Sequence, residues 1–205
     1  MKSIAPDLRN YETFSLYDFL KEKNNFEISS SVNEVFFEKQ TYIYQPPFNG
    51  NYVYEIISGS VKLGGYSDKG EEYIYDVLSK GDFFGNFMYL NGQFAEFSKA
   101  IVDVELRLYE LSFFKMEVKK YPVSAEWFFS YLTKRWYLTE KKLCKVNDSC
   151  VLGKLNFLEE VYQTNFMDAR GKIYNVYNLL TQKDKGDLVG ATRQTIASAL
   201  KSKLL

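Results

Sequence analysis

The hydrophobic and polar positions of this chain change period twice along its length. Between Glu34 and Tyr109, apolar runs rich in Tyr, Val and Ile recur at intervals of roughly 8 to 12 residues, with turn residues such as Gly64-Gly65 between them. This spacing predicts about seven short strands of an antiparallel sandwich or barrel. The runs are 35–37, 42–44, 52–57, 61–63, 73–78, 100–102 and 106–111. Before them, helical spacing of apolar residues within 11–24 predicts a short amphipathic helix.

Between Ser124 and Cys150 the period becomes that of a heptad seam. This stretch contains no Gly or Pro, and seam positions recur at alternating spacings of 3 and 4 residues. A long helix packed only on its own barrel is one explanation. A seam kept over three heptads favours pairing with a second copy of the helix in a symmetric dimer. The seam is Phe129, Leu132, Trp136, Thr139, Leu143, Val146 and Cys150, and we predict dimerisation through Phe129, Leu132, Trp136, Leu143 and Val146.

The C-terminal segment predicts a helix-turn-helix. Asn147-Asp148-Ser149 supplies a capping cluster for a helix leading into it. One helix then begins at Thr181, Gly190 provides the positive φ of a tight turn, and Thr192 caps a second helix. On that second helix Ile196, Leu200 and Leu204 repeat every four residues and face the core. The outer face then carries Arg193, Gln194, Ala197, Ser198 and Lys201.

This outer face suits DNA. Arg forms paired hydrogen bonds with guanine, and Gln does so with adenine. Thr192 and Thr195, near the positively polarised helix N-terminus, suit phosphate oxygens. From Arg170 onward seven cations stand against two anions, a net charge of +5 in a chain of net charge zero. A basic end on an acidic body indicates a polyanionic partner. A helical pair that merely packs is the alternative.

The composition argues against an enzyme. The chain contains no histidine, which removes Ser-His-Asp and Cys-His nucleophiles and His-ligated zinc or haem. Its two cysteines, Cys144 and Cys150, are too few for a disulfide scaffold or a four-thiolate cluster, and we expect them to be small buried hydrophobes on a helix. Neighbouring acids such as Glu71-Glu72 point to opposite faces of a strand. We therefore expect no catalytic site, no cofactor and no metal. Without an apolar leader or span, we expect a cytoplasmic protein with no membrane contact.

These motifs resemble the CRP/FNR family of bacterial transcription regulators. Residues 180–200 are similar to the DNA-reading motif of that family, and residues 54–62 and 78–85 are similar to its effector barrel. The resemblance implies an α+β fold with three parts. These are an N-terminal antiparallel β-barrel of the cupin-like jelly-roll type (1–121), a dimerisation helix (122–150) and a winged-helix-like helix-turn-helix domain (151–205). The sequence ends at Leu205, directly after the second helix, so we expect this domain to lack the wing, either in the natural protein or because this chain has been shortened.

The resemblance also implies roles for individual residues. Base contacts fall on Arg193, Gln194 and Ser198, and phosphate contacts on Thr181, Thr192 and Thr195, with Lys201 also holding the DNA backbone. The implied partners are a palindromic double-stranded operator, a second copy of the chain, RNA polymerase as a further candidate, and a small-molecule effector.

Two departures from the family pattern matter. Family members that bind cyclic nucleotide carry Gly-Glu and then Arg-Ser, where this chain has Gly85-Asn86 and Phe97-Ser98. We therefore expect an effector other than a cyclic nucleotide. The predicted pocket is Gly85, Asn86, Phe87, Phe97, Ser98 and Lys99. The second departure is Lys185, at a normally apolar position, where its stem is expected to snorkel. Together with the missing wing, Lys185 keeps open the alternative of a sensing barrel whose helix-turn-helix no longer binds DNA.

Overall fold

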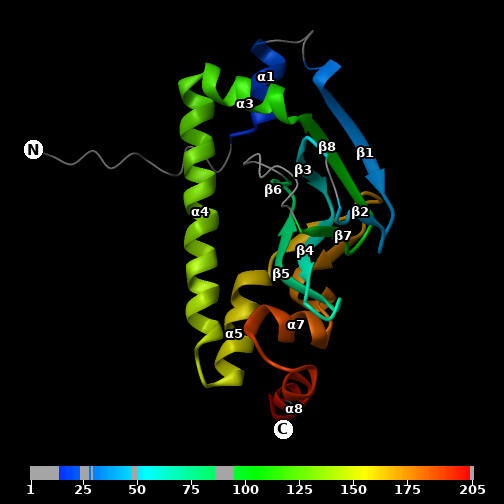
Figure 1. The fold of residues 1–205 in the computed structure, drawn as a ribbon, viewed down its shortest axis with the longest axis vertical. Helices are drawn as coiled ribbons and strands as arrows, with labels where there is room; N and C mark the ends of the chain where they lie inside the picture. Colours follow the sequence, from blue (N-terminus) through cyan, green and yellow to red (C-terminus); the bar gives the residue numbers. More distant parts are fainter. Residues whose placement is uncertain (1–13, 24–27, 29, 48–49, 86–94, 204–205) are drawn as a thin grey trace, which may run out of the picture.

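The computed structural model describes residues 14–23, 28, 30–47, 50–85 and 95–203. Two four-stranded antiparallel sheets face each other, with strand orders β1-β8-β3-β6 and β2-β7-β4-β5 (Figure 1). The predicted α+β class with an antiparallel sandwich is thus confirmed. The strands are β1 Val32–Phe37, β2 Tyr42–Tyr44, β3 Tyr52–Ser58, β4 Ser60–Tyr66, β5 Glu72–Ser79, β6 Phe83–Gly85, β7 Phe97–Ala100 and β8 Val104–Glu110.

The core between the sheets follows from the two-residue alternation of the strands. Tyr54 and Ile56 of β3 and Val61 and Leu63 of β4 are buried in one cluster with Leu106 of β8. Alternate residues of a strand point to the same face, so each strand contributes its apolar set to this layer.

The prediction of a turn at Gly64-Gly65 is wrong, because both glycines lie inside β4. A Cβ at Gly64 would lie 2.4 Å from the ring of Phe97, and one at Gly65 would lie 2.9 Å from the hydroxyl of Tyr73. The missing side chains therefore leave room for aromatic rings that cross β4. Sequence spacing alone does not distinguish this packing use of glycine from a turn.

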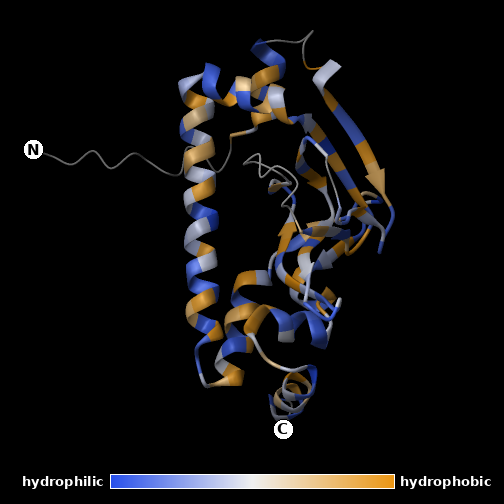
Figure 2. Ribbon diagram, in the orientation of Figure 1, coloured by the Kyte–Doolittle hydropathy of each residue, from blue (hydrophilic) through white to orange (hydrophobic). Residues whose placement is uncertain are grey.

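The sandwich is covered by the helices α1 Leu16–Lys23, α3 Leu111–Lys120 and α4 Pro122–Val146. The predicted first helix begins later than expected, and residues 11–13 and 24 lie outside the described residues. The helix α4 runs along the longest axis of the molecule beside both the barrel and the C-terminal end (Figure 1). Figure 2 shows apolar positions recurring along its whole length. Within the described ranges, no helix combines the length and apolar character that a membrane span requires.

Residues 151–203, called here the C-terminal module, contain α5 Val151–Tyr162, β9 Asn165–Met167, β10 Ile173–Asn175, α6 Val176–Leu179, α7 Gln182–Val189 and α8 Arg193–Lys203. The β9–β10 hairpin was not predicted, because each of its strands has only three residues. The starts of α4 and α5 fall at the predicted boundaries 122 and 151, although the division into domains stays a prediction.

The predicted cap of α5 needs correction. Cys150 is the N-cap, and its thiol accepts a hydrogen bond from the Gly153 N–H at 3.4 Å. Asp148, a member of the predicted capping cluster, does not cap the helix but accepts a hydrogen bond from the Cys150 N–H at 3.0 Å. Cys144 and Cys150 are both exposed, so their predicted burial is wrong.

Candidate nucleic-acid interface and effector site

The first helix of the helix-turn-helix begins where the sequence predicts. The Thr181 hydroxyl accepts the Asp184 N–H at 3.1 Å, and the Asp184 carboxylate accepts the Thr181 N–H at 3.0 Å. This reciprocal pair is a capping box, which satisfies two backbone donors at the start of α7. At the other end Gly190 has a φ of 64° and turns the chain toward α8. A Cβ there would be strained, which explains the glycine.

The second helix also has the predicted cap and core face. The Thr192 hydroxyl accepts the Thr195 N–H at 3.1 Å, and the two threonine hydroxyls lie 2.8 Å apart. Ile196 is fully buried, and Leu200 packs against the same cluster. Leu204 lies outside the described residues. The core side of α8 is therefore fixed, which turns the opposite side toward solvent.

That opposite side of α8 is exposed and polar. Arg193, Gln194, Ser198 and Lys201 are exposed, and Ala197 is half-buried. Within the described residues, no hydrogen bond or ion pair ties the side chains of Arg193, Gln194 and Lys201 to the rest of the chain. Their donors are thus available to an external partner, as base and phosphate contacts require. The roles of Arg193, Gln194, Ser198, Thr181, Thr192, Thr195 and Lys201 in DNA binding stay predictions.

Most of the basic charge of this segment is used inside the protein. Of the seven cations counted from Arg170 onward, only Arg193 and Lys201 have no partner within the described ranges. The +5 charge therefore overstates the number of phosphate contacts that α7 and α8 offer. The internal pairs are Arg170–Asp103 at 2.6 Å, Lys183–Asp187 at 2.7 Å and Lys203–Glu159 at 2.6 Å, and ring contacts are Lys172 over Tyr174 and Lys185 over Tyr177.

Lys185 is accommodated by an aromatic ring. Its side chain is buried, and its ammonium lies 3.9 Å from the ring centroid of Tyr177. Burial lowers the pKa of Lys185, while the charges of Glu159 and Asp184 act to raise it. A cation over a ring face recovers part of the lost hydration, so this departure is compatible with a packed module.

The predicted effector residues do not line one pocket. Ser98 is fully buried on the face of β7 that looks into the sandwich, opposite Tyr44 of β2. Phe97 points to the other face and packs with the C-terminal module. Lys99 shares that side, with its ammonium 4.3 Å from the ring centroid of Tyr42. The structure thus separates Phe97 and Lys99 from Ser98. Gly85 ends β6, and Asn86 and Phe87 lie outside the described residues.

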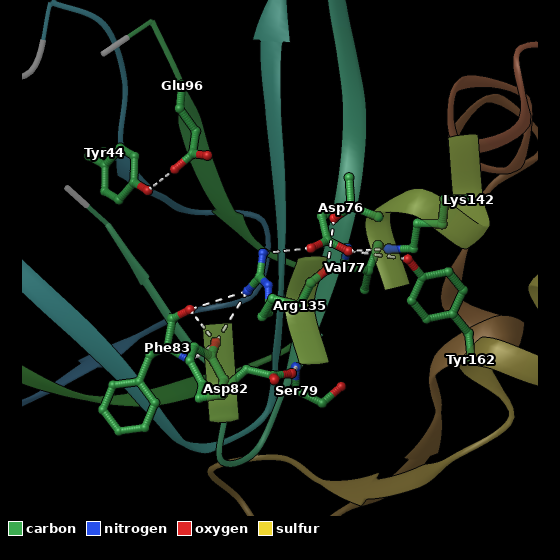
Figure 3. Close-up of polar contacts among 12 residues, drawn as sticks. Tyr44, Asp76, Val77, Ser79, Asp82, Phe83, Glu96, Arg135, Lys142 and Tyr162 are labelled. Carbon is green, nitrogen blue, oxygen red and sulfur yellow. Dashed lines mark hydrogen bonds and ion pairs between the residues drawn. The ribbon is translucent and has the colours of Figure 1, made fainter. Parts of the chain in front are cut away.

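The polar groups beside Ser98 were missed by the sequence analysis. The Tyr44 hydroxyl donates a hydrogen bond to the Glu96 carboxylate (Figure 3), and the rings of Tyr54 and Phe84 stack at 5.0 Å nearby in the same cluster as Tyr44. Burial raises the pKa of Glu96 to about 7, although the Tyr44 hydrogen bond and the charge of Arg135 act to lower it. Within the described residues the Ser98 hydroxyl has no hydrogen-bond partner. Glu96 lies two residues before Ser98, just ahead of β7, and this spacing was the available signal.

A second polar cluster joins three parts of the fold (Figure 3). The Asp76 carboxylate of β5 accepts hydrogen bonds from Arg135 at 2.8 Å and from Lys142, both on α4. The Tyr162 hydroxyl at the end of α5 lies 3.4 Å from the same carboxylate. Arg135 also donates to the Phe83 carbonyl at 3.3 Å. This side of α4 is therefore held on the barrel and the module.

The seam lies on the other side of α4. Trp136, Phe129 and Leu143 are 69%, 67% and 62% exposed, and Leu132 is 38% exposed. Val146 differs, because it is half-buried and close to Gly190 at the turn of the helix-turn-helix. Four of the five predicted dimerisation residues thus form one apolar stripe that the described part of the chain leaves exposed. No group of three or more His, Cys, Asp or Glu in the described part of the chain is placed to hold a metal ion.

Comparisons of sequence agree with this reading of the fold. A family model described as "Cyclic nucleotide-binding domain" matches residues 34–120, which span β2 to β8, the whole of α3 and most of β1. The chain is 26% identical over 152 residues to a "CRP-like cAMP-activated global transcriptional regulator" of Mycobacterium tuberculosis. That match covers 74% of this chain and 68% of the relative.

Solved structures show the same fold. FixK2 from Bradyrhizobium japonicum superposes with a TM-score of 0.67 at 20% identity, covering 83% of each chain. A putative CRP/FNR-family regulator from Eubacterium rectale superposes with a TM-score of 0.67 at 18% identity, covering 94% of this chain and 87% of that one. The resemblance to the CRP/FNR family is thereby confirmed. The M. tuberculosis relative and the E. rectale protein are both described as transcriptional regulators.

Proposed function

We propose that this relative of the CRP/FNR regulators is a sequence-specific DNA-binding transcription regulator that acts as a homodimer. The observation that carries the proposal is the outer face of α8, where Arg193, Gln194 and Lys201 are exposed without an internal partner. The fully buried Ile196 fixes the rotation of the helix, so these side chains point outward together. Figure 1 places α8 at the end of the molecule, where a duplex has access to it.

The homodimer is supported by the apolar stripe of α4. Four large side chains, Phe129, Leu132, Trp136 and Leu143, repeat along one side of a 25-residue helix and are exposed in the single chain. Burying each would stabilise a dimer by roughly 1.5 to 3 kcal/mol before ordering costs. A two-fold axis beside α4 would also present two copies of α8 to a palindromic operator.

The proposed effector is not a cyclic nucleotide. The M. tuberculosis relative is named as cAMP-activated. In this chain the carboxylate of Glu96 and the hydroxyls of Tyr44 and Ser98 share the inner face beside β7. A cyclic phosphate placed there would meet a carboxylate instead of the guanidinium that the family's binders use. Calorimetry with millimolar cAMP or cGMP is expected to show no binding, and a micromolar dissociation constant for either would contradict this assignment.

Selection from a library of random duplexes tests the DNA-binding function directly. We expect a palindromic consensus with half-sites about 10 to 10.5 base pairs apart, centre to centre. Arg193→Ala should lower affinity for that consensus by roughly 1 to 3 kcal/mol per half-site and relax the preference at one base pair. Lys201→Ala is the matched contrast, since losing a phosphate contact should weaken consensus and random DNA alike and flatten the salt dependence.

Two results would reject these assignments. If Arg193→Ala lowered the affinity for consensus and random DNA equally, Arg193 would be a phosphate contact and not a base contact. An absence of any enriched sequence at low salt would favour the alternative, a sensing barrel whose helix-turn-helix does not bind DNA.

A further inference from the structure

The helix α7 covers the open edge of a barrel strand. The strand β5 is the last strand of its sheet, so its outer backbone groups have no neighbouring strand to pair with. The Ile74 N–H donates to the Asp187 carboxylate at 3.2 Å, and the Lys183 ammonium donates to the Glu72 carbonyl at 2.5 Å. Covering an edge by side chains of another element satisfies exposed backbone groups and fixes that element to the sheet.

An ion pair completes this contact. The Lys62 ammonium of β4 lies 3.1 Å from the Asp184 carboxylate of α7, and both side chains are largely buried. Asp184 is also the capping-box residue of α7, so the barrel contacts the helix at its first turn. We call the contacts of Lys62, Glu72 and Ile74 with α7 the edge contact.

A second attachment lies at the β9–β10 hairpin. The Gly59 N–H donates to the Met167 carbonyl at 2.9 Å, and the Ala169 N–H donates to the Asp103 carbonyl at 3.1 Å. Between the two attachments, Phe97 and Ile74 of the barrel share one buried cluster with Leu155 and Leu188 of the module. Two separate polar contacts with an apolar layer between them leave the module no free rotation relative to the barrel.

This rigidity matters for binding a DNA operator that has two half-sites. Only residues 147–150 connect α4 with α5, so the chain connection alone would let the module swing. A symmetric dimer binds two half-sites about 34 Å apart, and simultaneous binding is strong only when both recognition helices are held at that separation. Figure 1 shows α7 between β5 and α8, so the edge contact fixes where α8 lies.

We infer that the edge contact of α7 with β4 and β5 sets the half-site spacing that the dimer accepts. The inference rests on the proposed DNA-binding function and adds a determinant of operator spacing that lies outside the DNA-contacting face. The contact acts by pre-organising the two copies of α8, so it affects binding to paired half-sites and leaves the binding of one half-site unchanged.

The test opens the contact from the barrel side, at a residue that is not itself among the predicted DNA contacts. Lys62→Glu places a carboxylate against Asp184, and the control Lys80→Glu makes the same charge change at an exposed barrel residue. The probes are the selected palindrome, a duplex with one half-site, and palindromes with one or two base pairs inserted between the half-sites. Amide hydrogen exchange at Ile74, whose N–H is bonded to Asp187, reports opening of the contact without DNA.

We expect Lys62→Glu to speed exchange at Ile74 and to lower affinity for the palindrome at least about tenfold, with half-site affinity within about twofold. We also expect Lys62→Glu to bind palindromes of every half-site spacing about equally, whereas the unmutated protein and Lys80→Glu prefer one spacing. Equal losses for palindrome and half-site, or an unchanged spacing preference with faster exchange, would overturn the inference alone. Slow amide exchange at Ile74 in both Lys62→Glu and Asp187→Ala would also overturn the inference. It would show that the module stays in place when these contacts are removed. No binding of any duplex by the unmutated protein would instead reject the proposed function, and this inference with it.

Discussion

Glu96 shows how one partly buried carboxylate makes the stability of the fold depend on pH. Its pKa is about 7 in the folded protein, above the ordinary value of 4.5. Between these values the native state holds a proton that the unfolded chain has released, so stability falls as pH rises toward and through 7. Burial within the barrel, against the Tyr44 hydrogen bond, is the cause.

Glu96→Gln should remove this dependence. Glutamine keeps an oxygen that accepts the Tyr44 hydroxyl but carries no charge to bury. We expect the unmutated protein to lose roughly 2 kcal/mol more than the variant between about pH 5 and pH 8, as measured by urea unfolding. The control is Glu71→Gln at an exposed position, which should keep the pH dependence of the unmutated protein. Parallel pH curves for Glu96→Gln and the unmutated protein would show that Glu96 titrates near its ordinary value.

At the scale of elements, α4 has two faces with different tasks. One face is fixed on the barrel by Arg135 and Lys142, which both contact Asp76. The other face carries the exposed seam. Because the inner face holds the helix in one rotation, the seam is presented as a stripe that a second copy can match.

Trp136→Glu tests this arrangement. A carboxylate in the middle of the seam would have to be buried without a partner in the dimer, so we expect dissociation to monomers at micromolar concentration. Analytical sedimentation measures the oligomeric state. Lys141→Gln changes the charge by the same amount at an exposed position off the seam and should leave the dimer intact. A monomeric unmutated protein at micromolar concentration would contradict the predicted interface.

The sequence predicted these elements better than their contacts. The heptad spacing found α4 and its seam, and the motif of residues 180–200 found both helices and both caps of the helix-turn-helix. Periodicity reports which face of an element is apolar, and capping depends on residues three apart, so both are local signals. The partner of Arg135 is Asp76, 59 residues away, and no local signal points to it. Phe97 and Ser98 were placed in one pocket because the resemblance to the family aligned them with its ligand-binding pair, although adjacent strand residues face opposite sides.

At the scale of the whole molecule, the barrel and the C-terminal module share a core. Phe97, Ile74 and Val77 of the barrel belong to the same buried cluster as Leu155, Leu188 and Ile196 of the module. Phe97 is fully buried, and its ring contacts Tyr42 and Tyr66 at 5.9 and 5.4 Å between centroids. The barrel and module therefore depend on each other for part of their burial, and we expect them to unfold together.

Phe97→Ala tests that dependence. Removing a fully buried ring should cost about 3 to 5 kcal/mol, because the transfer term and the cavity add. Since the ring belongs to the cluster that the two parts share, amide exchange should speed up by a similar factor in β4, β5 and α7, and calorimetry should show one transition at lower temperature. Tyr75→Ala removes a ring that is 44% exposed on the same sheet and should cost much less. If α7 kept its protection while β4 and β5 lost theirs, or if two transitions appeared, the module would be an independently stable unit. The edge contact on β5 would then have to hold its position without help from the shared core.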